Sequence, residues 1–128
     1  EQGRGRQGNE WISPLGNLYM SVLLKPLCDV ELAGQISFVA ALAVSAGVGD
    51  FMAPGHEKTL KWPNDILVDG KKCAGILLES ETGAGSRVDD LIIGIGVNVL
   101  APPPERVGVG AVADPQKRVA IHPLRDRI

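Results

Sequence analysis

The chain has 128 residues, of which 45% are hydrophobic and 22% are charged, and its formal net charge at pH 7 is −2. This length and composition fit one globular domain with its own hydrophobic core and exclude a chain that is disordered throughout. The 13 basic residues are outnumbered by 15 acidic ones, so no overall positive field points to a nucleic-acid partner.

The N-terminal segment is polar and glycine-rich, without the apolar stretch of a secretory signal. Residues 1–9 predict a loop and residues 13–16 a turn. Apolar residues alternate over residues 17–25, which predicts a strand that Pro26 ends. Because the chain begins with Glu1 inside this loop, we expect it to be a fragment of a longer protein.

One long helix is predicted next. Asp29 is a suitable N-cap, and apolar residues at helical spacing continue to about Ala46, with Gly47 and Gly49 at the C-terminus. The most apolar window, residues 36–48, is shorter than the ~20 residues that a bilayer requires. We therefore expect a core helix of a soluble protein and no membrane span.

The second half of the chain predicts strands and hairpins. Asp69-Gly70 is a strong two-residue turn signal between two apolar runs. The predicted strands are 60–62, 66–68, 71–79 and 91–99, with a turn at 81–86. Hairpins combined with one long helix predict an α+β fold, a mostly antiparallel mixed sheet packed by helices.

Cys28 and Cys73 are too far apart in sequence for a CxxC metal site or redox pair. They are expected to be free thiols in a reducing compartment, which favours a cytoplasmic location.

Four short segments carry residues suited to chemistry. The first is Gly3-Arg4-Gly5-Arg6-Gln7-Gly8. Its glycines let backbone amides approach an anion, and its two guanidinium groups can fork around the anion's oxygens. Taken alone, the run also fits a flexible tail or an RNA-binding Arg-Gly segment.

The second segment is Lys61-Trp62-Pro63-Asn64-Asp65. Pro63 should turn the chain out of the sheet and leave Asn64 and Asp65 at a strand exit. There the two side chains could bind a ligand or a divalent ion. A simple turn beside a packed tryptophan is the alternative.

The third and fourth segments lie on predicted strands. Because successive strand residues face opposite sides, only one of Lys71 and Lys72 can point into the fold, where it would face a carboxylate or phosphate. The alternative is a pair of solvated lysines. Glycines in Gly94-Ile95-Gly96-Val97-Asn98 indicate either close approach of a ligand or a β-bulge.

In their order and spacing these segments resemble the catalytic domain of bacterial biotin–protein ligases (biotin–[acetyl-CoA carboxylase] ligases). The matching segments are GRGRQG followed by Trp11, SPLGNLYMS (13–21), KWPND (61–65), GKKCAGILLE (70–79) and GIGVN (94–98), which cover about residues 3–99. The resemblance implies ATP-dependent attachment of biotin to a lysine of a biotin carboxyl carrier protein. Biotin and ATP would be the substrates, Mg²⁺ would assist, and biotinyl-5′-adenylate would be the intermediate.

The resemblance also implies roles for individual residues. Arg6 and Lys72 are expected to be catalytic, at the reacting phosphate and the biotin carboxylate. The implied biotin-binding residues are Gln2, Gly3, Arg4, Gly5, Arg6, Lys72 and Gly75. The implied ATP-binding residues are Arg6, Trp11, Asn64, Asp65, Gly96 and Asn98. No metal ligand can be assigned. An apolar lining of Leu18, Ile76 and Ile95 would strengthen contacts between cations and phosphate.

The chain departs from the family's pattern in three ways. Gln2 stands where the family usually has alanine, and Gln7 and Asn9 replace more basic residues in the loop. The strand that holds biotin upstream of the loop has no counterpart, nor does an N-terminal DNA-binding domain. We therefore expect a partial catalytic domain at 1–100, an irregular tail outside the family's pattern at 101–128, and weak or undetectable biotin transfer. Homodimer formation is left open.

Two other functions remain open at this stage. A lipoate or octanoyl transferase is similar in fold and also modifies a carrier lysine, although KWPND and GRGRQG argue against it. The chain could instead be a non-catalytic remnant that binds a partner, or binds biotin weakly. Biotin-dependent exchange between ATP and pyrophosphate would separate these functions.

Overall fold

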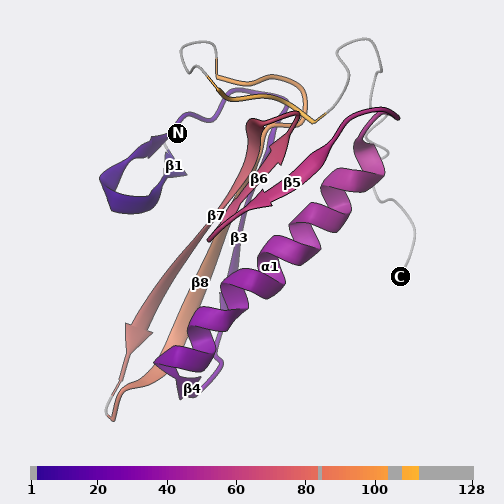
Figure 1. Cartoon of the computed structure of the whole chain (residues 1–128). Coiled ribbons are helices and arrows are strands. Elements are labelled where there is room, and N and C mark those ends of the chain that lie inside the picture. Colours follow the sequence, from indigo (N-terminus) through magenta and orange to yellow (C-terminus); the bar gives the residue numbers. More distant parts are fainter. Residues whose placement is uncertain (1–2, 84, 104–107, 113–128) are drawn as a thin grey trace, which may run out of the picture.

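A computed structural model describes residues 3–83, 85–103 and 108–112 (Figure 1). In chain order its elements are β1 (Gly3–Arg4), a 3₁₀ turn (Arg6–Gly8), β2 (Glu10–Trp11), β3 (Leu18–Leu24), β4 (Cys28–Asp29), α1 (Val30–Phe51), β5 (Lys58–Lys61), β6 (Asp65–Val68), β7 (Lys71–Thr82) and β8 (Arg87–Val97). Six strands form the main sheet, in the order β3-β8-β7-β6-β5, with β4 also paired to β8. All the strand pairs named here are antiparallel. The α+β prediction is confirmed.

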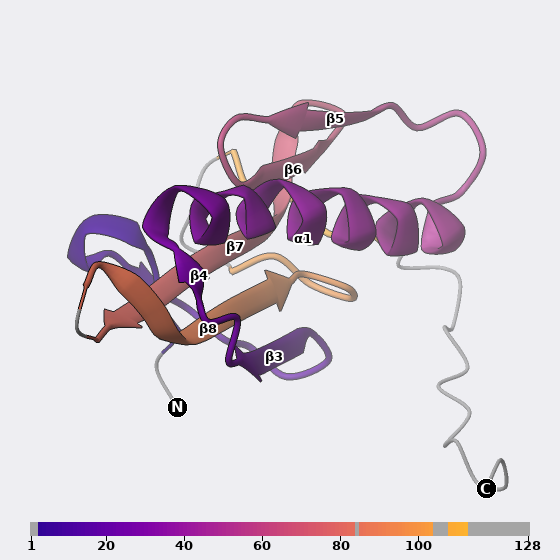
Figure 2. The ribbon, with the colours of Figure 1, turned by 90° about the horizontal axis from the view of Figure 1, so that it is seen from below.

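The helix α1 lies along one face of the sheet (Figure 2). Its buried side chains are Ala33, Ala41, Ser45 and Val48, which recur at helical spacing. Small residues on this stripe bring the helix close to β7 and β8, where Ile76 and Ile93 pack against Ala41. Asp29 occupies the N-cap position as predicted, without a side-chain cap hydrogen bond.

The helix is longer than predicted. It continues through Gly47 and Gly49 to Phe51, because Val48 is buried against Ile66 and Val68 and this packing outweighs the low helix propensity of glycine. The Lys58 ammonium also donates to the Ser45 carbonyl, 2.5 Å away, and a Cβ at Gly49 would lie 2.7 Å from that ammonium.

The expectation that the apolar segment is too short for a bilayer is therefore wrong. At 22 residues, with a window of mean hydropathy 1.7, α1 is long and apolar enough to cross a membrane by length and composition. Core helices of soluble proteins, which are mostly buried, meet the same criterion; α1 packs on the sheet with one face, and 22% of this window is buried.

The predicted hairpin turn at Asp69-Gly70 is confirmed. Both residues have positive φ, 50° and 73°, as a two-residue hairpin turn requires. The Asp69 carboxylate accepts hydrogen bonds from the His56 ring, at 2.6 Å, and from the Glu57 backbone N–H, at 2.9 Å. The hydrogen bond from His56, followed by that from Glu57, holds the pKa of Asp69 below its ordinary value.

The N-terminal segment was predicted to be a loop, but part of it forms a short β-hairpin. Gly3 pairs with Trp11 and Arg4 with Glu10, so β1 and β2 make a small separate hairpin. The Gly5 N–H donates to the Asn9 carbonyl at 2.6 Å, and a Cβ at Gly5 would lie 2.9 Å from that oxygen. Glycine at this position is therefore a steric requirement of the turn.

Candidate active site

The pocket on the sheet is an open cavity of about 570 Å³. Every predicted site residue that the structure describes lines it. These residues are Gly3, Arg4, Gly5, Arg6, Trp11, Asn64, Asp65, Lys72, Gly75, Gly96 and Asn98. Gln2 lies outside the described residues. The fold thus gathers these residues from four separate parts of the sequence around one cavity.

Two glycines form a flat floor for this pocket. Gly75 on β7 and Gly96 on β8 are cross-strand partners, and Tyr19 on β3 pairs with Gly96 on its other side. The Trp11 ring lies against both glycines, since a Cβ would meet it at 3.0 Å from Gly75 and at 2.7 Å from Gly96. The strand glycines therefore mark a close approach, here by the indole of Trp11.

The Trp11 indole N–H is buried and has no hydrogen-bond partner among the described residues. An unsatisfied buried donor costs roughly 1–3 kcal/mol. The Lys72 ammonium lies 5.4 Å from the centroid of the same ring, a distance at which a cation is attracted to the aromatic face. The indole thus covers the glycine floor at the cost of one unpaired donor.

A β-bulge determines where Lys72 points. Along β6, Ile66 pairs with Ala74 and Leu67 with Lys72, so Cys73 is the extra residue on β7. Regular alternation would place Lys72 and Gly75 on opposite faces of the strand. The bulge instead brings the Lys72 side chain beside Gly75, while Cys73 and Ala74 are both completely buried. Such re-aiming of a side chain is a common use of bulges near functional sites.

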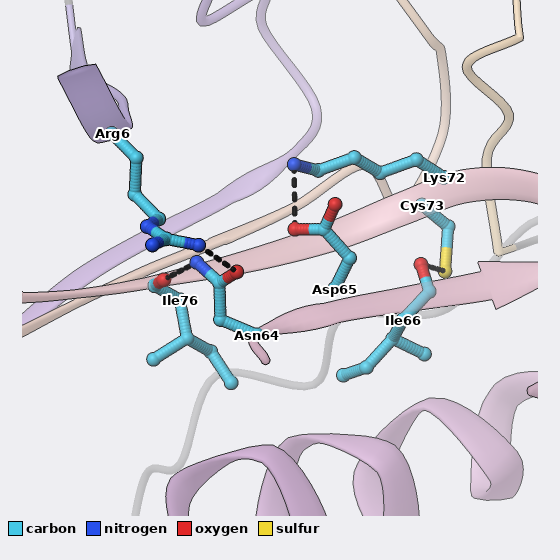
Figure 3. A network of polar contacts seen from close by, with 7 residues as sticks. All are labelled: Arg6, Asn64, Asp65, Ile66, Lys72, Cys73 and Ile76. Carbon is cyan, nitrogen blue, oxygen red and sulfur yellow. Dashed lines mark hydrogen bonds and ion pairs between the residues drawn. The ribbon is translucent and has the colours of Figure 1, made fainter. Parts of the chain in front are cut away.

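The Lys72 ammonium lies 2.7 Å from the Asp65 carboxylate (Figure 3). Asp65 is the first residue of β6 and the cross-strand partner of Gly75, which places its carboxylate next to the glycine floor. Both side chains are partly exposed, 35% for Lys72 and 22% for Asp65. An ammonium has three donors, so Lys72 can hold Asp65 and still donate to a ligand anion.

Asn64 ties Arg6 to the sheet. The Asn64 carbonyl accepts from the Ile76 backbone N–H at 3.0 Å, and its side-chain amide donates to the Ile76 carbonyl. The amide oxygen then accepts from the Arg6 guanidinium at 3.4 Å (Figure 3). Asn64 and Asp65 were predicted at a strand exit, but they instead end the turn and begin β6.

Arg4 is placed less firmly than Arg6. Its guanidinium lies 3.6 Å from the Glu79 carboxylate, and the two side chains are 82% and 48% exposed. Exposed pairs of this kind contribute little to stability. Arg4 is therefore free to move toward an anion in the pocket.

Some pocket residues were missed or misassigned by the sequence reasoning. Leu18 does not line the pocket, because it pairs with Val97, while the neighbouring Tyr19 and Ser21 are the residues opposite the glycines. The expectation for Ile76 and Ile95 is confirmed. Tyr19 and Ser21 lie opposite Gly96 and Gly94, and these glycines could have indicated an open space beside them. The pairing register between β3 and β8 could not be predicted from the sequence.

The described residues include no group of three or more His, Cys, Asp or Glu side chains that could hold a metal ion. Mg²⁺ usually binds through one or two carboxylates together with substrate phosphates. Two carboxylates line the pocket, those of Glu10 and Asp65. They fit an arrangement in which the ion is bound together with the phosphates of a ligand.

These features define an open pocket in which the cationic side chains of Arg6 and Lys72 lie with the Trp11 ring. Residues 1–98 match the Biotin/lipoate A/B protein ligase family, and the chain belongs to this family. It is 46% identical over 101 residues to the biotin–[acetyl-CoA-carboxylase] ligase of Paracoccus denitrificans, covering 79% of this chain and 42% of that protein. It is 34% identical to the corresponding Mycobacterium tuberculosis ligase, covering 97% of this chain and 48% of the relative.

The fold comparison agrees. The chain matches the crystal structure of the Leishmania major biotin protein ligase in complex with biotinyl-5-AMP with a TM-score of 0.70 and 33% identity, covering 87% of this chain and 49% of that one. The chain thus spans about half the length, or less, of each of these proteins. The division at residue 100 and the unmatched tail remain predictions, because most of 101–128 lies outside the described residues.

Proposed function

We propose that this chain carries the ligand site of a biotin–protein ligase, which joins biotin and ATP as biotinyl-5′-adenylate and passes the biotinyl group to a carrier lysine. The observation that supports this proposal best is the pocket itself, in which Lys72, Arg6 and the Gly75–Gly96 floor share one cavity. The relative solved with biotinyl-5-AMP has the same fold, which favours an acyl-adenylate as the ligand.

Lys72 and Arg6 supply the positive charge that the first step needs. In that step a biotin carboxylate oxygen attacks the α-phosphorus of ATP, a P–O bond to that oxygen forms, and pyrophosphate leaves. Negative charge increases on the oxygens around phosphorus, so fixed cations at that place lower the barrier. Lys72 would bind the carboxylate and the phosphate, and Arg6 would bind the phosphate. Catalysis here is positioning and charge stabilisation, with no covalent enzyme intermediate.

The second step transfers the biotinyl group from the adenylate to the carrier. The carrier lysine's neutral amine attacks the acyl carbon of the adenylate, the amide bond forms, AMP leaves with the electron pair of the broken C–O bond, and one proton of the amine passes to solvent. The carrier is proposed to be a biotin carboxyl carrier domain, as the name of the Paracoccus denitrificans relative indicates for that protein.

Trp11, Gly96 and Asn98 are proposed to form the adenine end of the site. The glycines let the indole lie close to the sheet, and a flat base could stack on the face of the indole that points away from them. Mg²⁺ is proposed to accompany the nucleotide, with Asp65 as the nearest described carboxylate beside Lys72. A cytoplasmic location is proposed because both cysteines are free.

Biotin-dependent exchange of labelled pyrophosphate into ATP, with Mg²⁺, tests the first step on this chain. We expect exchange with biotin and none with lipoate or octanoate. Exchange with lipoate instead would establish a lipoate ligase, and no exchange together with no binding of biotinyl-5′-adenylate would contradict the proposal.

Labelled biotin transfer to a carrier domain tests the second step. We expect turnover slower than on the order of 0.1 per second. Among the described residues, β3 pairs only with β8, and several of its side chains are exposed beside the pocket, including Tyr19 at 39% and Met20 at 43%. Water therefore has access to that side of the site.

A further inference from the structure

Among the described residues, the side chain of Asn17 makes more hydrogen bonds than that of any expected site residue, yet it does not line the cavity. It lies directly before β3. Its side-chain oxygen accepts from three successive backbone N–H groups, those of Val99 at 2.9 Å, Leu100 at 3.1 Å and Ala101 at 3.3 Å. Successive N–H groups that converge in this way form a concavity suited to an anion or a carbonyl oxygen.

The amide nitrogen of Asn17 points the other way in the same network. It donates to the Ala101 carbonyl at 2.8 Å and to the side-chain oxygen of Asn98 at 3.5 Å. One amide therefore holds both the turn that follows β8 and the side chain of the last residue before that turn.

Asn98 is the pocket residue on which this network acts. It is completely buried and lines the cavity. Its backbone N–H donates to the Cys73 carbonyl at 2.7 Å, and its side-chain nitrogen donates to the Gly110 carbonyl at 3.3 Å. The side-chain oxygen of Asn98 accepts from the Asn17 amide at 3.5 Å, so Asn17 and Gly110 together set the orientation of the planar Asn98 carboxamide.

Gly16 shows that the two segments are packed closely. It has a φ of 89°, and a Cβ there would lie 2.8 Å from a methyl carbon of Leu100. The turn before β3 therefore fits directly against the turn after β8, which brings Asn17 within reach of all its partners.

We propose that Asn17 is a positioning residue, which orients the Asn98 carboxamide for the nucleotide end of the pocket. The nature of the ligand rests on the proposed function, whereas the orientation of Asn98 does not. Asn17 has two parts: its side-chain oxygen accepts from the N–H groups of residues 99–101, and its NH₂ group donates to the Ala101 carbonyl and to Asn98.

The variant Asn17→Asp separates these parts. A carboxylate keeps an oxygen for the three N–H groups, but it turns a second oxygen toward the oxygens of Asn98 and Ala101. We expect a melting temperature below that of the wild type, because the Ala101 carbonyl also loses its donor, and about tenfold weaker binding of biotinyl-5′-adenylate by calorimetry. Gln35→Glu, which adds the same charge on an exposed residue of α1, should change neither quantity. Wild-type affinity in Asn17→Asp would overturn the proposal.

A double-mutant cycle then tests whether Asn17 acts through Asn98. We expect Asn17→Ala to weaken adenylate binding in the wild type and to have no further effect in the Asn98→Ala background, because the group that it orients is then gone. If the losses of adenylate affinity in the two single variants multiply in the double variant, the two residues act independently and the proposal is contradicted.

A measurement without ligand keeps this inference separate from the proposed function. In NMR spectra of the free chain, Asn17→Asp should shift the side-chain NH₂ resonances of Asn98 and leave the amides of Val99–Ala101 protected from exchange. Unshifted Asn98 resonances would overturn the inference whatever the ligand is. Failure of the wild-type chain to bind adenylate, with the shift present, would overturn the proposed function alone.

Discussion

The Lys72 ammonium and the Asp65 carboxylate are 2.7 Å apart, although six residues lie between them in the sequence and each comes from a different strand. The pair forms because Asp65 is the cross-strand partner of Gly75 and the bulge at Cys73 brings Lys72 to the same face. Asp65 therefore holds the ammonium over the glycine floor before any ligand is present.

Replacing Lys72 with alanine should impair the adenylation step strongly. The change removes a charge-assisted contact with the reacting groups and leaves Asp65 unpaired, so we expect a loss of about 2–4 kcal/mol of transition-state stabilisation in pyrophosphate exchange. Lys71→Ala, on the exposed side of the same strand, should change it by no more than about 0.5 kcal/mol. Equal effects of the two substitutions would refute the role of Lys72.

Arg6→Gly should affect the adenylate more than biotin. The guanidinium is proposed to contact the phosphate, which biotin lacks, and its partner in the free chain is the Asn64 amide at 3.4 Å. We expect faster dissociation of biotinyl-5′-adenylate in stopped-flow measurements, by about tenfold or more, with biotin affinity changed by less than about threefold. A matching loss for both ligands would place Arg6 elsewhere in the site.

Much of this fold follows from local rules. The alternation before Pro26, the Asp69-Gly70 turn and the N-cap at Asp29 each depend on a few neighbouring residues, and the structure has all three. The end of the helix does not follow from such rules, because the burial of Val48 against Ile66 depends on residues that are distant in sequence.

In the site, too, some features follow from the local sequence and others depend on residues that are distant in sequence. Its residue types and spacing pointed to the correct segments, and residues from each of them line one pocket. The bulge at Cys73 and the pairing of Tyr19 with Gly96 are properties of strand register, which a single sequence does not specify. Asn17 was missed for a related reason, since its partners lie more than 80 positions away.

The ring of Trp11 should report on the space above Gly96. In a Trp62→Phe background, which removes the other tryptophan, Gly96→Ala should shift the Trp11 emission, because a Cβ there would lie 2.7 Å from the indole. Gly94→Ala on the same strand is the control, since its Cβ would have no neighbour closer than 3.6 Å. Identical spectra for the two variants would show that the indole does not rest on Gly96 in solution.

The same tryptophan should respond to the ligand. We expect biotinyl-5′-adenylate to change the Trp11 emission more than biotin alone does, because the adenine ring is proposed to stack on the indole. An emission spectrum that adenylate leaves unchanged would contradict the stacking.

The thiol of Cys73 should be chemically inert in the folded chain. The side chain is completely buried, and burial raises its pKa from 9.0 to about 11. Since the thiolate is the reactive form, iodoacetamide at pH 8 should label the partly exposed Cys28 in the native chain and both thiols in denaturant. Mass spectrometry of peptides distinguishes the two sites. Equal labelling of both in the native chain would show that the bulge opens readily.

The raised pKa of Cys73 also makes stability depend on pH in the alkaline range. The folded chain binds this proton more tightly than the unfolded chain, so the stabilisation is complete below pH 9.0 and is lost as the pH rises toward about 11. Other groups titrate in the same range, and the comparison that isolates the thiol is with Cys73→Ala. From urea titrations at pH 8 and pH 11, the wild type should lose about 2 kcal/mol more of its unfolding free energy than Cys73→Ala does. Parallel losses in the two chains would contradict a protonated thiol at the bulge.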